Sequence, residues 1–203
     1  MKILTLIFDT IFPPRVTEVL LREVTELKIK SRFLPHRIQH TICLSTYKEP
    51  LIRALITENK YHESEDARKH LATLLELWLH EQTIPVVLIP IPLSAKRERT
   101  RGYNQVTVVL KALSQSPTTS IDTTLLKRNR HTTAQTTLNR EDRLKNLTSA
   151  FSCDTQKVYS YRHCALVIVD DVFTSGATMK AAHAAIAPHL HPTTTLLCLA
   201  FAH

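Results

Sequence analysis

The stretch "ALVIVDDVFTSGATM", residues 165–179, constrains the fold of this chain more than any other segment. It begins with five aliphatic residues, as expected of a strand that is buried on both faces. Two adjacent aspartates, Asp170 and Asp171, end the apolar run, and a hydroxyl-rich turn around Gly176 follows. An alanine-rich segment at 177–190 predicts a helix that Pro188 ends or kinks. A strand, a short turn and a helix in this order indicate one unit of an α/β sheet.

Glycine is rare in this chain, which holds only Gly102 and Gly176 among 203 residues. A chain of this length at the usual ~7% would carry about 14 glycines. Both follow an apolar strand and precede a helix, which is the carboxyl edge of a parallel sheet, where α/β proteins bind ligands. We therefore expect both at positions where a positive φ or a close backbone approach excludes a side chain. Such a turn lets backbone N–H groups approach a phosphate.

The remaining patterns predict a mostly parallel α/β sheet flanked by helices, with a helical N-terminal segment. Strands and helices alternate over residues 84–203, which we expect to form the core. Residues 1–83 have mainly helical periodicity and are expected to form a cap or hood on that core. The expected strands include 84–93, 165–169 and 193–202, and the expected N-terminal helices lie near 15–30, 51–56 and 71–78. The last of these helices is expected to begin after the cluster Ser64, Glu65 and Asp66, which suits a helix N-terminus.

Charge and cysteine content narrow the class of protein. The net charge of +8 favours an anionic partner, which leaves nucleic acid, a membrane surface and a phosphorylated small molecule open. The four cysteines are far apart and form no C-x-x-C pair, so neither a disulfide framework nor a zinc ribbon is indicated, and a cytoplasmic protein is expected. No apolar run reaches the ~20 residues of a membrane span. The first 15 residues are interpreted as structure rather than a signal peptide.

The two aspartates need a partner, because adjacent carboxylates repel one another unless a cation or a hydrogen-bond donor lies nearby. Magnesium or a pair of ribose hydroxyls would serve. Together with the turn that follows, the pair predicts a sugar-phosphate site, in which the acids hold the diol and the turn holds the 5′ phosphate. The alternative is that the acids only cap a loop. The turn residues are Thr174, Ser175, Gly176, Ala177 and Thr178. A Walker A loop and a dinucleotide fingerprint are excluded, because both need glycines that this chain lacks.

A basic segment follows the strand at 84–93. Four positive charges lie within six residues, and they would stabilise a bound pyrophosphate. A solvated basic loop or a nucleic-acid patch is the alternative. Asn104 and Gln105 are weaker signals, which are expected to bond the loop backbone and fix its shape. The four basic residues are Lys96, Arg97, Arg99 and Arg101.

These segments carry a resemblance to a known family. "VIVDDVFTSGAT" resembles the phosphoribosyl-pyrophosphate (PRPP) signature of type I phosphoribosyltransferases. "IPIPLSAKRERTRGYNQ", "RNRHTTAQTTLNREDRLKNLTSAF" and "LIRALITENKYH" are similar to segments of the ComF competence-protein family, so the resemblance covers roughly residues 48–180. It implies a type I phosphoribosyltransferase fold that binds PRPP with Mg²⁺ and transfers a phosphoribosyl group to an unidentified acceptor, releasing pyrophosphate. The alternative is a non-catalytic accessory protein in DNA uptake, binding single-stranded DNA, or a PRPP-sensing regulator.

The resemblance also implies roles for individual residues. Asp170 and Asp171 would contact the ribose hydroxyls, and residues 174–178 would wrap the 5′ phosphate. The pyrophosphate loop would comprise Ser94, Ala95, Lys96, Arg97, Arg99, Arg101 and Gly102. Residues 127–146 would form a mobile hood, with Arg128, Arg130, Gln135, Arg140 and Arg143 as ligand-contacting candidates and His131 as the histidine to test.

The resemblance departs from the family at the N-terminus. Family members commonly begin with paired cysteines that bind zinc, whereas the only early cysteine here is Cys43. We therefore expect no zinc, and we expect magnesium to come with PRPP rather than from a dedicated protein site. No base for the acceptor can be assigned, and a homodimer is left open.

Overall fold

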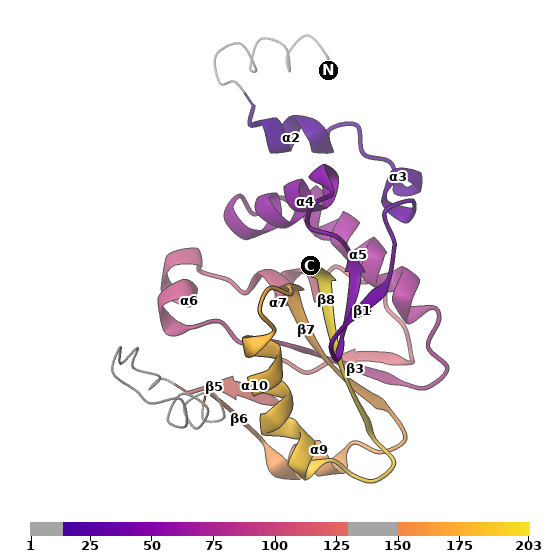
Figure 1. Cartoon of the computed structure of the whole chain (residues 1–203), viewed down its shortest axis with the longest axis vertical. Coiled ribbons are helices and arrows are strands. Elements are labelled where there is room, and N and C mark those ends of the chain that lie inside the picture. The colour runs from indigo at the N-terminus through magenta and orange to yellow at the C-terminus, as the bar shows by residue number, and fades with distance from the viewer. Residues whose placement is uncertain (1–13, 130–149) are drawn as a thin grey trace.

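A six-stranded sheet forms the centre of the protein (Figure 1). The computed structural model describes residues 14–129 and 150–203. In this part of the chain the strand order is β1-β2-β8-β7-β3-β4, and only β1 runs antiparallel to its neighbour. The strands are β1 (His36–Ile38), β2 (Thr41–Ser45), β3 (Val86–Pro90), β4 (Thr119–Ile121), β7 (Ala165–Val172) and β8 (Thr195–Ala202). A second, two-stranded sheet pairs β5 (Leu126–Arg128) with β6 (Phe151–Cys153).

Helices cover both faces of the sheet, and the first five residues of β7, which are all buried, alternate between two core clusters. Val167 belongs to a core cluster with Leu55 and Leu75, whereas Leu166 belongs to a second cluster with Ile186. The first cluster contains α4 (Pro50–Tyr61), α5 (Glu65–Leu79) and α7 (Gln105–Leu110), and the second contains α9 (Thr155–Ser160), α10 (Ala177–Ile186) and the small sheet. The expected fold class, a mostly parallel sheet flanked by helices, is confirmed.

The N-terminal segment contains strands as well as helices. The single helix expected near 15–30 is two short helices, α2 (Val16–Leu21) and α3 (Glu26–Lys30). The hairpin of β1 and β2 was not anticipated, and β2 pairs in parallel with β8 at the edge of the main sheet. These strands are only three and five residues long, so they carry little sequence periodicity. The division of the chain at residue 83 stays a prediction.

The expected helix boundaries hold where capping signals were present. Ser64 caps α5 by accepting a hydrogen bond from the backbone N–H of Ala67. The α-helix α10 gives way to a 3₁₀ turn, η1 (Ala187–His189), at Pro188. None of the helices in the described ranges is both long and apolar enough to cross a membrane.

Candidate ligand-binding site

A cavity of about 410 Å³ opens at the carboxyl ends of β3 and β7. This is the sheet edge where the sequence predicts a ligand site. Its walls come from the end of α4, the turn after β3, α6 (Ala95–Arg101), the start of α7, the end of β5 and the turn after β7. The lining residues are Lys60, Tyr61, Ile91, Pro92, Leu93, Ser94, Arg97, Arg101, Gln105, Arg128, Asp170, Asp171, Val172, Thr174 and Thr178.

Asp171 is held by groups from two helices. The Nζ atom of Lys60, near the end of α4, lies 2.8 Å from Oδ2 of Asp171. The side-chain amide of Gln105 donates a hydrogen bond to the same oxygen, at 2.7 Å. Arg101 in turn donates to the amide oxygen of Gln105. These contacts join α4, α6 and α7 to the end of β7, so the second charge of the aspartate pair is already compensated by the protein.

Asp170 is compensated less completely. Its Oδ1 accepts the backbone N–H of Asp171 at 2.8 Å. Burial and the neighbouring charge of Asp171 raise the pKa of Asp170, and this hydrogen bond, Lys60 and Arg97 only partly oppose the rise. These contacts therefore compensate the ionised form of Asp170 only in part. Hydrogen-bond donors or a cation supplied by a ligand would offset that cost.

The turn after β7 is built on a tight contact at Gly176. Gly176 has φ +73° and caps the N-terminus of α10. A Cβ atom there would lie 2.7 Å from Cζ of Phe173, which is closer than such atoms approach, and 3.3 Å from Oε1 of Gln39, which is a tight contact. Both reasons expected for a glycine, positive φ and close approach, are thus present at this position. Thr174 and Thr178 are exposed and face the cavity.

The basic segment after β3 forms a helix, where the sequence suggested a loop. The hydroxyl of Ser94 caps α6 by accepting the backbone N–H of Arg97 at 3.4 Å. Of the seven residues assigned to the pyrophosphate loop, Ser94, Arg97 and Arg101 line this cavity, whereas Ala95, Lys96, Arg99 and Gly102 do not. Gly102 ends α6 with φ +76°, and no atom lies within 4 Å of a Cβ built there. Its requirement for glycine is therefore conformational only.

Arg128, a candidate of the expected hood, reaches the cavity from the end of β5. Its guanidinium lies 5.2 Å from the centre of the Phe151 ring. Burial, followed by the nearby charge of Arg97, lowers the pKa of Arg128, whereas Asp170 opposes this effect. The other hood candidates, Arg130, Gln135, Arg140 and Arg143, together with His131, lie outside the described residues.

Two residues of the site were missed as ligand-site candidates. Lys60 lies in the stretch "LIRALITENKYH", so the family-like Lys-Tyr pair was the available signal. Gln105 was expected to bond the loop backbone, but its side chain bonds Asp171 instead. Asn104 does act on the backbone, because it accepts the N–H of Val106 and donates to the carbonyl of Ile91.

The cavity carries more positive than negative charge. Its ionised side chains are four cations, Lys60, Arg97, Arg101 and Arg128, against two carboxylates, Asp170 and Asp171. The acids and the glycine turn lie at the end of β7, and Arg97 and Arg101 lie after β3, the strand next to it. A covered, mostly parallel sheet with these two segments at one edge defines a protein of the type I phosphoribosyltransferase fold.

Comparison with known proteins gives the family. No family model matches the chain. The chain is 35% identical over 146 residues to competence protein F of Haemophilus influenzae, a match that covers 68% of this chain and 62% of that protein. It is 31% identical over 147 residues to DNA utilization protein YhgH of Escherichia coli K12, with 70% and 63% covered. The chain belongs to the ComF competence-protein family, and its matches span just under two thirds of the length of these relatives.

A search of solved structures finds an allosteric regulatory enzyme of purine biosynthesis. The match has a TM-score of 0.41 and 15% sequence identity, and it covers 70% of this chain and 30% of that chain.

Proposed function

We propose that this protein binds PRPP with Mg²⁺ in the cavity and transfers its phosphoribosyl group to an acceptor, with release of pyrophosphate. The observation that carries the proposal is the convergence of three groups on one cavity: the aspartate pair, Thr174 and Thr178 of the turn around Gly176, and the side chains of Arg97 and Arg101. In this proposal the acids bind the ribose hydroxyls, the turn binds the 5′ phosphate and the arginines bind the diphosphate.

In the proposed reaction the protein would position the two substrates and stabilise the charges that develop as the bond to the diphosphate breaks. An acceptor nucleophile displaces the diphosphate from C1 of the ribose, and positive charge develops on the sugar ring as the bond to the leaving group breaks. The carboxylates at the end of β7 would stabilise that ring charge, and Arg97 and Arg101 would stabilise the departing diphosphate. The supply of hydroxyl and backbone N–H donors at residues 174–178 would fix the 5′ end of the substrate.

The residues present fit a magnesium ion that arrives with the substrate. Oδ2 of Asp171 is already bonded to Lys60 and Gln105, so the two acids cannot provide the several free oxygens of a dedicated magnesium cage. Asp170 would be the nearest protein oxygen to such an ion or to the ribose. When bound, the ion would neutralise charge on the diphosphate.

A thermal-shift measurement tests ligand binding. PRPP at about 100 times its dissociation constant, with Mg²⁺, would stabilise the protein by about 2.7 kcal/mol. At ~2–4 °C per kcal/mol for a chain of this size, the melting temperature would rise by roughly 5–10 °C. The double variant Asp170→Asn with Asp171→Asn should lose this shift, because the ribose hydroxyls lose both acceptor charges.

The matched control is Asp66→Asn, which removes one exposed carboxylate in the first turn of α5 that does not line the cavity. This variant should retain the full shift. An intact protein whose melting temperature does not respond to PRPP would rule out the proposal. Transfer is measured separately, by pyrophosphate release from PRPP with a panel of bases and amines.

A second candidate function is a non-catalytic accessory role in DNA uptake, or PRPP sensing without turnover. The names of the relatives, competence protein F and DNA utilization protein, together with the net charge of +8, favour it. Binding to single-stranded DNA that weakens steeply with salt, without pyrophosphate release, would support the accessory role. A PRPP-induced thermal shift without turnover in the panel would support sensing.

A further inference from the structure

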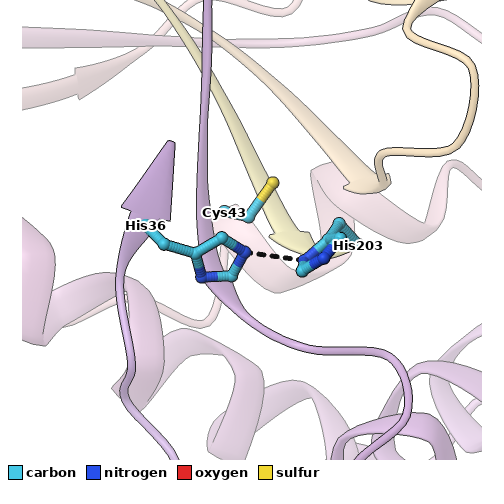
Figure 2. Close-up of side chains that lie close together, drawn as sticks. All are labelled: His36, Cys43 and His203. Atoms are coloured by element: carbon cyan, nitrogen blue, oxygen red, sulfur yellow. Dashed lines mark hydrogen bonds between the residues drawn. The ribbon is translucent and has the colours of Figure 1, made fainter. Parts of the chain in front are cut away.

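Two side chains of the β1–β2 hairpin lie close to a third that follows β8, at the edge of the sheet formed by these three strands. They are His36 of β1, Cys43 of β2 and His203, directly after β8 (Figure 2). Their nearest imidazole nitrogens and the Cys43 sulfur all lie within 4.8 Å of one another. The strand register produces this arrangement, because His36 is paired with Cys43 across the hairpin and Cys43 is paired with Ala200 of β8. Imidazole nitrogen and thiolate sulfur are the preferred ligands of zinc.

The hydrogen bonding of His36 prepares one of its nitrogens for a metal ion. Nδ1 of His36 lies 2.8 Å from the carbonyl oxygen of Leu34, and since a carbonyl can only accept, Nδ1 carries the proton. In the neutral ring the lone pair is then on Nε2, which faces Nδ1 of His203 at 2.6 Å. Histidines that bind metals commonly donate their other ring N–H to a backbone carbonyl in this way, which fixes the tautomer and the ring orientation.

We propose that His36, Cys43 and His203 bind one borderline-soft divalent metal ion, with Zn²⁺ as the expected ion. The site has three protein ligands, and water would occupy the fourth position, because His203 is exposed. Zn–N bonds of about 2.0–2.1 Å in a tetrahedral site separate two nitrogen ligands by about 3.3 Å. The two rings, now 2.6 Å apart at their nearest nitrogens, would have to move apart by about 0.7 Å. The exposed His203 side chain can make that adjustment.

The simpler interpretation is a core cysteine beside a hydrogen-bonded histidine pair. Cys43 is fully buried and packs with Phe173 and Ala200. Burial raises the pKa of its thiol to about 11, so without a metal the thiol is neutral. A bound cation favours the thiolate and displaces the proton. In the proposed site the Cys43 thiolate and both imidazole rings bind one metal ion, whereas in the simpler interpretation none of them does.

The sequence did not predict this site, and no zinc was expected. We expected no zinc because the chain lacks paired cysteines at short spacing. The two histidines of this site are separated by 167 positions and come together only through strand pairing. The proposal does not depend on PRPP binding, because none of the three residues lines the cavity proposed to bind PRPP.

Cobalt titration of the full chain, after treatment with a chelator, tests the site. Co²⁺ should bind with one equivalent and give a thiolate-to-cobalt charge-transfer band, and Zn²⁺ should displace it. His36→Gln and His203→Gln should each weaken binding at least about 10-fold, since second-shell changes alone typically cost 10–100-fold. His189→Gln is the matched control, because it removes an exposed histidine of η1 outside the cluster and should leave the titration unchanged.

Cys43→Ser should abolish the charge-transfer band, with Cys153→Ser, a cysteine of β6 outside the cluster, as its control. Since Cys43 is buried, its variant is first checked for folding by circular dichroism, and if it does not fold the two histidine variants decide the question. Binding without a charge-transfer band in the intact protein, or binding that both histidine variants leave unchanged, would overturn the proposal. Absence of saturable binding would do the same.

Discussion

The two segments that border the cavity are built in different ways. The turn after β7 is fixed by packing and bonding, because Gly176 contacts the Phe173 ring and Asp171 is bonded to Lys60 and Gln105. The segment after β3 is helix α6, which has no buried residue, and a Cβ built on Gly102 at its end would have no atom within 4 Å. In the proposed site the first segment binds the ribose 5-phosphate part of the ligand and the second binds the diphosphate.

This difference indicates that the two segments contribute to ligand binding in different ways. A preformed turn loses little conformational entropy when it binds, so it can select a ligand by shape. Arg97 is exposed, so its side chain retains more freedom and contributes mainly charge. In the proposed reaction, the segment that releases the diphosphate would need less rigidity than the segment that positions the ribose. Substitutions at equivalent positions of the two segments should therefore have unequal effects.

The largest difference is expected between the two glycines. Gly102→Ala should cost about 1 kcal/mol of the free energy of unfolding, because alanine is strained at positive φ. Gly176→Ala adds a steric clash with Phe173 to the same strain and should cost about 2–4 kcal/mol. Urea denaturation of both variants measures the difference. Equal losses of stability would show that the Phe173 contact does not constrain the turn.

The next difference is between the effects of two aspartates, Asp170 in the cavity and Asp122 outside it, on the free energy of unfolding. The raised pKa of Asp170 means that its ionisation weakens the fold, and this loss grows as pH rises through the raised value. Asp170→Asn should therefore stabilise the ligand-free protein at neutral pH, by about 1 kcal/mol, and leave it unchanged at low pH. Asn keeps the oxygen that accepts the N–H of Asp171. Chemical denaturation between pH 4 and pH 8 measures the effect, and a destabilised variant at pH 7 would contradict it.

Asp122, which does not line the cavity, has a pKa that is shifted in the opposite direction. Burial opposes its ionisation, but hydrogen bonds from Lys157, the backbone and side chain of Thr124 and the hydroxyl of Tyr161 lower its pKa to about 2. The stability that it contributes is present above its ordinary pKa of 3.8 and is lost as pH falls from there to about 2. Asp122→Asn should cost about 2 kcal/mol at pH 7. Unchanged stability would show that these bonds contribute nothing net.

The smallest difference is expected within the basic segment. Arg97 lines the cavity and the neighbouring Lys96 does not, although each substitution by alanine removes one positive charge. Arg97→Ala should weaken binding of pyrophosphate by about 10-fold, the value of one charge-assisted hydrogen bond. Lys96→Ala should change it less than about 2-fold, because an exposed charge outside the cavity is screened. Isothermal titration calorimetry at 0.15 M salt measures both, and equal losses would indicate long-range charge rather than contact.

The parts of the fold that followed from the sequence are those with strong local signals. The apolar run of β7, the cap at Ser64 and the break at Pro188 each depend on a few adjacent residues. The hairpin of β1 and β2 did not follow, because such short strands are stabilised by pairing with β8 rather than by their own propensity.

The site was predicted in part for the same reason. The acid pair and the glycine turn are contiguous, and the structure places them beside the cavity. Lys60 could not be assigned to Asp171 from spacing, since the contact depends on where α4 ends relative to β7. Which of the four basic residues line the cavity depends on the side of α6 from which each projects. A charged segment without apolar residues has no periodicity that would predict this side from the sequence.

The position of Phe173 links substitutions at sites that are distant in sequence. Its ring packs against Gly176 on one side and belongs to the same buried cluster as Cys43 and Ala200. A larger residue at position 43 or 200 would push the ring toward the glycine, where no space is left. We therefore expect related sequences to vary in concert at positions 43, 173, 176 and 200, so that one sequence change in this group is tolerated only after another.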